Sequence, residues 1–174
     1  CFAYTEGEPV LRNIDLSVPA GGSLAIVGPS GSGKSTLLQL LMGHHRGYEG
    51  SISIDGTELR DISPASLYEL LSVIQQEVFI FNSSIEKNVT MFGDFAPERV
   101  EAALEGAGLS ALISERGLDF VCGENGQNLS GGERQRVSIA RSLLKKTPVL
   151  LVDEATAALD RPTATEVMCA VLDI

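Results

Sequence analysis

The sequence predicts an α/β fold built around a parallel sheet. Three observations support this prediction: strand-like and helix-like segments alternate along the chain, glycine-rich turns separate them, and no repeat or low-complexity tract interrupts the order. The chain has 174 residues and 44% apolar composition, which suits one globular domain with one sizeable core.

The first elements surround a glycine loop. Residues 13–18 alternate apolar and polar side chains, which predicts a half-buried strand. A turn over residues 19–22 leads to a second, apolar strand over 23–27. After the loop, leucines at helical spacing predict a buried helix over 34–42 that ends near Gly43.

A β-hairpin is predicted next. Residues 51–54 and 57–59 read as two short strands, and Asp55-Gly56 between them accepts the positive φ angles of a tight turn. This hairpin marks an antiparallel portion of the fold.

The second half of the chain is predicted to be mainly helical. A strand at 71–74 precedes two short helices, at 97–106 and 109–114, with Pro97 in a first turn. A longer helix over 132–146 is followed by a buried strand at 149–153. We expect the arginines of the long helix, Arg134, Arg136 and Arg141, to be exposed charges.

Charge and composition argue against several classes of protein. The formal charge of −10, from 13 basic and 23 acidic residues, argues against a nucleic-acid-binding protein. No apolar run approaches the ~20 residues of a spanning helix, so we expect a soluble chain. Three widely spaced cysteines fit reduced thiols better than a disulfide framework.

A phosphate-binding loop is the sharpest motif. It matches G-x-x-x-x-G-K-[ST] between a predicted strand and a predicted helix. Backbone N–H groups of such a loop turn toward phosphates, Lys34 neutralises the β and γ oxygens, and the Ser35 hydroxyl suits Mg²⁺. The predicted nucleotide-binding residues are Gly28, Pro29, Ser30, Gly31, Ser32, Gly33, Lys34, Ser35 and Thr36.

Two carboxylates stand where the predicted strand at 149–153 ends. They come at its C-terminal end, where ligands bind in open α/β sheets. Asp153 is predicted to bind Mg²⁺, directly or through a water ligand of the metal, and Glu154 to orient and polarise the attacking water. An ordinary capping role for the two acids is the alternative.

A second glycine-rich segment opens the long helix. Ser130 and Glu133 form an S-x-x-E capping box, while Gly131 and Gly132 leave bare N–H groups open to an anion. An ordinary cap does not need two glycines in its first turn, where each lowers helix propensity by ~1 kcal/mol. The pattern therefore predicts a close approach to a ligand.

At this point the sequence resembles the ATP-binding cassette family. Residues 129–135 resemble its signature sequence, with Glu133 in place of the commoner glutamine. Gln75-Gln76 resembles the glutamine loop, with Gln76 chosen as the functional member over Gln75. Residues 157–160 resemble the aspartate loop, and Tyr4 lies where the family places an aromatic that stacks on adenine.

The resemblance implies an ATPase with a defined architecture. The implied fold is a P-loop NTPase core with a parallel sheet, an antiparallel β subdomain and a helical subdomain that carries the signature. ATP and Mg²⁺ are the implied cofactors. The implied Mg²⁺ ligands are Ser35, Gln76 and Asp153, and the implied catalytic residues are Lys34, Gln76 and Glu154.

Partners are implied as well. In this family two cassettes meet head to tail, so Ser130, Gly131 and Gly132 of one chain would cover the γ-phosphate held by another. Residues 121–126 and 79–88 resemble exporter sequences that contact membrane domains. The implied location is the cytoplasmic face of a membrane. An importer subunit and a soluble cassette enzyme acting on DNA or ribosomes are the alternatives.

One family element is not found in the sequence. The family carries a histidine beyond the aspartate loop that contacts the γ-phosphate, and neither His44 nor His45 matches its position. We therefore expect residues 1–174 to be an ATP-binding cassette domain truncated before this histidine.

Overall fold

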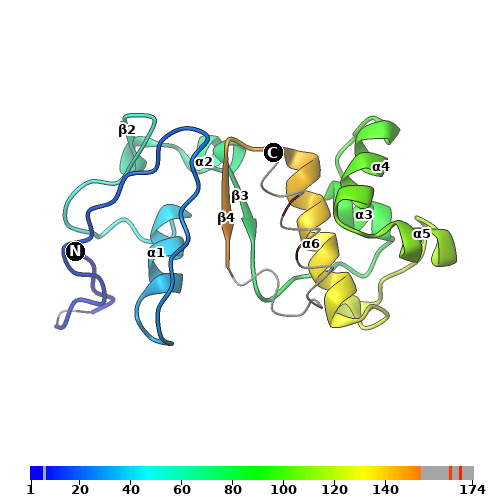
Figure 1. The fold of residues 1–174 in the computed structure, drawn as a ribbon, viewed down its shortest axis with the longest axis horizontal. Coiled ribbons are helices and arrows are strands. Elements are labelled where there is room, and N and C mark those ends of the chain that lie inside the picture. The colour runs from blue at the N-terminus through cyan, green and yellow to red at the C-terminus, as the bar shows by residue number, and fades with distance from the viewer. Residues whose placement is uncertain (6, 154–164, 166–168, 170–174) are drawn as a thin grey trace. The chain divides into compact units, whose positions relative to one another are not determined.

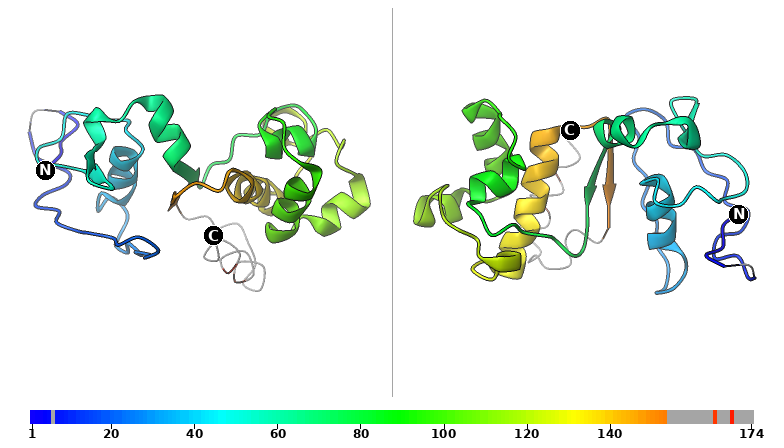
Figure 2. Two further views of the ribbon diagram at one scale, coloured as in Figure 1. Left: turned by 90° about the horizontal axis from the view of Figure 1, so that it is seen from above. Right: turned by 180° about the vertical axis from the view of Figure 1, so that it is seen from behind.

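The computed structural model describes residues 1–5, 7–153, 165 and 169. The chain forms two compact units, Cys1–Leu70 and Leu71–Ile174 (Figures 1 and 2).

The first unit packs around helix α1. This helix spans Lys34–Leu41, one residue shorter than predicted, and ends at Met42. Gly33 forms its N-cap in a left-handed conformation that suits glycine, with φ 93°. Buried side chains from three stretches of sequence pack together in this unit: Phe2, Leu11, Leu40 and Tyr48, with Leu37 and Ile52 against them.

The predicted hairpin is confirmed. Strand β1, Ser53–Ile54, pairs antiparallel with β2, Thr57–Glu58. Asp55 and Gly56 at the turn have φ angles of 48° and 79°, the positive values that Asp-Gly was expected to adopt. A 3₁₀ helix, Leu59–Asp61, and helix α2, Pro64–Leu70, complete this unit.

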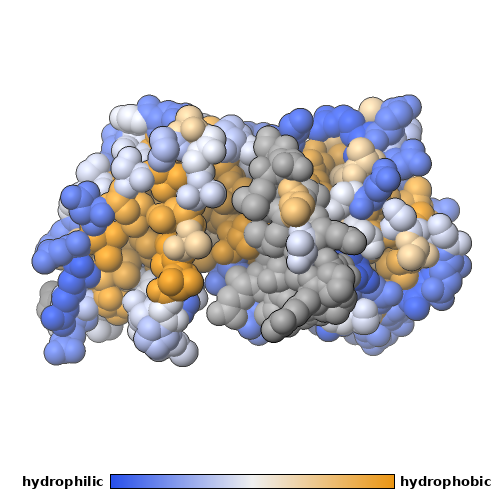
Figure 3. Space-filling view, in the orientation of Figure 1, coloured by the Kyte–Doolittle hydropathy of each residue, from blue (hydrophilic) through white to orange (hydrophobic). Residues whose placement is uncertain are grey.

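The two strands predicted before the glycine loop are absent. Residues 13–27 form no strand, and apolar side chains in this stretch, such as Ile14 and Leu16, are about half exposed at 50% and 48%. A strand needs a neighbour that takes its backbone hydrogen bonds. Within the described residues no strand pairs with 13–27, so the apolar alternation alone does not produce one. Figure 3 shows apolar surface over the part that holds α1.

The second unit contains a parallel pair of strands. Strand β3, Leu71–Ile74, lies beside β4, Val149–Val152, with Leu71 opposite Val149 and Ile74 opposite Val152. Both strands agree with the predicted bounds to within one residue. They bring two segments that are far apart in the sequence into one ladder.

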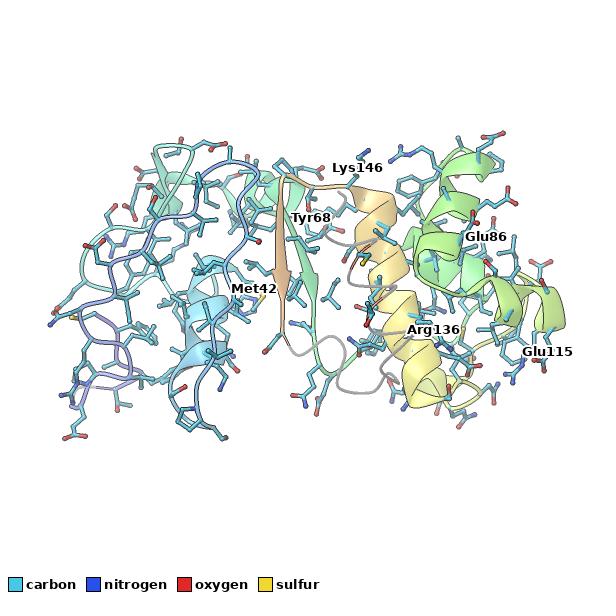
Figure 4. The ribbon with its side chains drawn as sticks, viewed as in Figure 1. Met42, Tyr68, Glu86, Glu115, Arg136 and Lys146 are labelled. Atoms are coloured by element: carbon cyan, nitrogen blue, oxygen red, sulfur yellow. The ribbon has the colours of Figure 1, made fainter. Side chains whose placement is uncertain are left out.

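Helix α6 is central to the second unit. It spans Gly131–Lys145, packs against α3, α4 and β3, and ends at Lys146 in a left-handed conformation (Figures 1 and 4). The other helices are α3, Ile85–Thr90, α4, Pro97–Gly106, and α5, Ser110–Arg116. The largest fully buried apolar side chains of this core are Ile74, Ile80, Ile85, Val89, Leu109, Val137 and Ile139.

The prediction that the arginines of this helix are exposed charges is wrong. All three are only partly exposed, because α6 is packed on several sides. Arg134 Nη1 donates to the Leu129 carbonyl at 2.7 Å, and Arg141 Nη1 donates to the Phe79 carbonyl at 2.8 Å. Arg136, labelled in Figure 4, has a buried Nε with no hydrogen-bond partner among the described residues.

Candidate functional site

The glycine loop has the backbone geometry of a turn that exposes N–H groups. Gly31 and Gly33 have φ angles of 78° and 93°. At Gly33 an added Cβ would also lie 2.7 Å from Leu11 Cδ2, so both conformation and space require glycine. The loop runs directly into α1, and the helix N-terminus therefore adds partial positive charge beside it.

Lys34 folds back over this loop. Its ammonium donates to the carbonyl oxygens of Gly28 at 2.8 Å and Pro29 at 3.0 Å. The cation is thereby held above the turn from which it projects, where a phosphate cradled by the loop would meet it.

Tyr4 lies beside the same helix. Its hydroxyl is 3.0 Å from Thr36 Oγ1 and donates to Gln39 Oε1 at 3.0 Å. The ring meets Phe2 and His45 edge-on, with centroids 5.1 and 5.3 Å apart, yet the residue is 53% exposed. An exposed aromatic residue anchored to Thr36 therefore lies next to the loop.

The second glycine segment begins α6 as predicted. Ser130 Oγ accepts from the Glu133 N–H at 3.2 Å, and Glu133 Oε2 accepts from the Ser130 N–H at 2.6 Å, which completes the capping box. Partial burial works to raise the pKa of Glu133, but the hydrogen bonds from Ser130 outweigh it, and the pKa is lowered. Glu133 is therefore an anion that holds the cap, and it leaves the first-turn amides of Gly131 and Gly132 to other partners.

Gln76 and Asp153 each follow a strand at the same end of the parallel ladder. The last paired residues are Ile74 and Val152. The Asp153 N–H donates to the Ile74 carbonyl at 2.8 Å, which extends the pairing by one bond. Gln75 and Gln76 are both exposed, and Asp153 is half-buried. The carboxyl ends of parallel strands thus carry both predicted metal ligands of this unit.

The predicted site residues therefore form two sets. Tyr4 and the glycine loop with Lys34, Ser35 and Thr36 belong to the first unit, and Gln76, Ser130–Gly132 and Asp153 to the second. Glu154 and the aspartate loop at 157–160 lie outside the described residues.

Two further residues were missed by the sequence reasoning. Gln39 binds the Tyr4 hydroxyl, and Gln135 Nε2 donates to the Gln75 carbonyl at 3.3 Å. Gln135 belongs to the signature-like segment. Its polar side chain on a packed helix was the feature of the sequence that could have indicated this hydrogen bond. Nothing in the local sequence signals Gln39.

Comparisons with known proteins agree with this geometry. Residues 11–157 match the ABC transporter family. The chain is 44% identical over 164 residues to an ATP-dependent lipid A-core flippase of Hahella chejuensis, covering 91% of this chain and 28% of that protein. It is 43% identical over 177 residues to the mitochondrial iron-sulfur clusters transporter ABCB7 of Homo sapiens, covering 99% of this chain and 23% of that protein.

A solved structure is similar over nearly the whole chain. It is the ATP-bound structure of a bacterial Atm1-family ABC exporter, with a TM-score of 0.94, 39% identity, and coverage of 99% of this chain and 31% of that one. The chain thus spans less than a third of the length of these relatives. By its sequence and its fold, this chain belongs to the ABC transporter family.

Proposed function

We propose that this chain binds and hydrolyses ATP as the motor domain of a membrane exporter. The observation that carries the proposal is the position of the Lys34 ammonium, 2.8 and 3.0 Å from two carbonyls of the glycine loop. Gly31 and Gly33 adopt positive φ angles, which allow the backbone of the same loop to turn beneath the Lys34 ammonium. Such a loop at a helix N-terminus fits a triphosphate.

The residues present also fit the base and the metal of MgATP. Tyr4 offers a half-exposed ring on which adenine can stack, and Thr36 beside it suits a phosphate oxygen. The family resemblance assigns Mg²⁺ to Ser35, Gln76 and Asp153, and each of these side chains carries the kind of hard oxygen that Mg²⁺ prefers. When bound, Mg²⁺ adds positive charge at the phosphate oxygens where negative charge develops.

Glu154 is proposed to orient the attacking water. In the sequence it comes directly after Asp153, the residue that follows β4, and ligands bind beyond the carboxyl ends of the strands in α/β folds. Positioning governs phosphoryl transfer, because in-line attack tolerates little displacement of the nucleophile.

A second cassette is the proposed partner. The amides of Gly131 and Gly132 lie in the first turn of α6, and the side chains of Ser130 and Glu133 already satisfy each other's N–H groups. The exposed N-terminus of α6 can therefore receive the γ-phosphate held by the other chain's loop. ATP would then bridge the two chains.

Export is favoured over import by the named relatives and by an exposed apolar surface. The relatives are a flippase, a mitochondrial transporter and an exporter. In the exporter-like segments and just after them, Phe79, Phe92 and Val121 are 61%, 57% and 51% exposed. We propose that they face the membrane domains, with the chain on the cytoplasmic side. The charge of −10 disfavours a DNA or ribosome partner.

Membrane domains are proposed partners because the chain spans less than a third of the length of a flippase, a transporter and an exporter to which it is similar. Among the described residues, no helix of the chain itself could span a bilayer. Transport would then depend on spanning segments supplied by other parts of the transporter.

The test is the Glu154→Gln variant of the complete protein. Turnover should fall at least about 100-fold, because the carboxylate base is lost, while ATP affinity stays within about twofold. The ATP-bound dimer should accumulate and be detectable by size-exclusion chromatography. Glu115→Gln, at an exposed position of α5, is the matched control and should behave like wild type. Full turnover in Glu154→Gln would refute the assigned role.

A further inference from the structure

The segment that carries Gln76 is held to helix α6 at its first residue. Gln135 lies on α6 and is only 3% exposed. Its Nε2 donates to the backbone carbonyl of Gln75 at 3.3 Å, across 60 residues of sequence. The buried side-chain amide of Gln135 therefore makes a hydrogen bond to the residue directly before Gln76.

The same segment is held to α6 three residues after Gln76. Arg141 Nη1 donates to the backbone carbonyl of Phe79 at 2.8 Å. Arg141 Nε donates to the Asn88 carbonyl at 2.7 Å, and Nη2 donates to Asn88 Oδ1 at 3.0 Å. One guanidinium thus joins α6 to the segment after Gln76 and to helix α3.

Asn88 extends this connection along the loop between Gln76 and α3. It is fully buried, and its Oδ1 accepts from the Phe81 N–H at 2.8 Å. Its Nδ2 donates to the carbonyls of Phe81 and Ser84, each at 3.0 Å. A loop with little regular structure of its own therefore takes its conformation from Asn88, and Asn88 is fixed by Arg141.

The guanidinium of Arg141 acts as a clamp, because it holds several acceptors in place at once. Its described partners are backbone carbonyls and an amide oxygen, and no carboxylate is among them. Burial lowers the pKa of Arg141 to about 10, which still leaves it charged at neutral pH. A partly buried cation without a counter-ion is costly, and only arginine presents donors in a planar fork that reaches several acceptors at once.

We infer that Gln135 and Arg141 are positioning residues that fix both ends of the 75–79 segment to α6. Gln76 then follows the helix whose N-terminus, at Ser130, is proposed to contact the γ-phosphate of the other chain. From Ser130 to Arg141 a rigid helix spans ~16 Å, so a tilt of α6 on ATP binding would displace the segment with it. The inference rests on the proposed function, and it supplies a physical link between nucleotide and Gln76.

The test compares Arg141→Gln, Arg141→Lys and Gln135→Met in the complete protein. For Arg141→Gln, kcat for ATP should fall about tenfold and KM should change less than about twofold, because catalytic geometry is lost while the loop that binds ATP is untouched. Arg141→Lys should recover part of kcat, since one ammonium replaces one of the three bonds. The double variant Arg141→Gln/Gln135→Met should lose less than the two single effects combined.

Amide hydrogen exchange provides the second readout. In Arg141→Gln, peptides from residues 75–90 should exchange about tenfold faster, while peptides of α4 and of the first unit keep wild-type rates. Arg99→Gln is the matched control, because Arg99 Nη2 also donates to a carbonyl of α6, that of Leu144, at 2.9 Å, while the described structure shows no hydrogen bond from Arg99 to residues 75–88. It should keep both kcat and the exchange of 75–90.

Two outcomes would overturn the inference. One is faster exchange spread evenly over residues 71–153, which would make Arg141 a general packing residue. The other is wild-type kcat in Arg141→Gln together with loosened 75–90 peptides, which would show that the clamp does not position Gln76. If Arg141→Gln does not fold, Arg141→Lys carries both readouts. A wild-type protein without ATPase activity would refute the proposed function instead, and exchange alone would then decide whether the clamp exists.

Discussion

The ammonium nitrogen of Lys34 lies 2.8 Å from the carbonyl oxygen of Gly28, the residue that opens the glycine loop. The loop therefore holds the cation in place, where it can exchange these carbonyls for phosphate oxygens. Lys34→Ala should weaken ATP binding about 10- to 100-fold, the effect of losing one or two bonds to a charged group. Isothermal titration calorimetry measures this directly. Lys87→Ala, at an exposed position of α3, is the control. Unchanged affinity in Lys34→Ala would contradict the assignment.

Two serines cap helices in the same way and allow a matched comparison. Ser130 Oγ and Ser84 Oγ each accept from the N–H three residues later at 3.2 Å. Ser130→Ala and Ser84→Ala should each lower the free energy of unfolding by about 1 kcal/mol. Only Ser130→Ala should also weaken ATP-dependent dimerisation, measured by analytical ultracentrifugation, because α6 alone is proposed to meet the second nucleotide. Equal loss of dimer in both variants would reduce the role of Ser130 to capping.

Gly33 and Gly31 separate backbone strain from steric overlap. Both have positive φ, so alanine at either position should cost roughly 1–2 kcal/mol. At Gly33 the new Cβ also meets Leu11 Cδ2 at 2.7 Å, whereas nothing lies within 4 Å at Gly31. Denaturant unfolding should therefore show a larger loss for Gly33→Ala. Leu11→Ala in the same chain should restore part of the difference, and equal losses at the two glycines would argue against the overlap.

Tyr48 gives the first unit a dependence on alkaline pH. Its hydroxyl donates to Glu58 Oε1 at 2.5 Å, and burial together with this bond raises the pKa of Tyr48 to about 12, from about 10 in an unfolded chain. The folded state therefore holds the proton more tightly than the unfolded state. This stabilisation is complete below pH 10 and is lost as the pH rises toward 12.

Thermal unfolding between pH 9 and pH 12 tests this dependence. Tyr48→Phe should give a flatter decline of Tm over this range, while Tyr68→Phe, at a residue 60% exposed, should keep the wild-type slope. A wild-type slope in Tyr48→Phe would show that another group controls the decline.

Sequence reasoning succeeded where short-range chemistry determines the structure. The capping pair Ser130 and Glu133, the Asp55-Gly56 turn and Pro97 at the start of α4 act within a few residues, and each element appears within a residue or two of its predicted bounds. The strands that precede Gln76 and Asp153 were each predicted from the sequence, whereas their parallel pairing, which puts both residues after the same end of one ladder, comes from the structure.

Sequence reasoning failed where residues far apart in the chain determine the local structure. Apolar alternation over 13–18 predicts a strand, but a strand also needs a paired neighbour, which local sequence does not reveal. The arginines of α6 read as surface charges because the carbonyls that bind Arg141 lie 53 and 62 residues away. Every residue has a backbone carbonyl, so the sequence does not show which carbonyl an arginine will bind.

The bonds of Arg134 and Arg141 to carbonyl oxygens affect how the stability of the unit around α6 depends on ionic strength. Ion pairs at a surface weaken when salt screens the charges, but a carbonyl carries no net charge to be screened. The bonds of Arg134 to the Leu129 carbonyl and of Arg141 to the Asn88 carbonyl are also partly buried. An acidic chain of net charge −10 has its self-repulsion reduced by added salt. The unit around α6 should therefore withstand large changes of salt concentration, even where contacts at its surface do not.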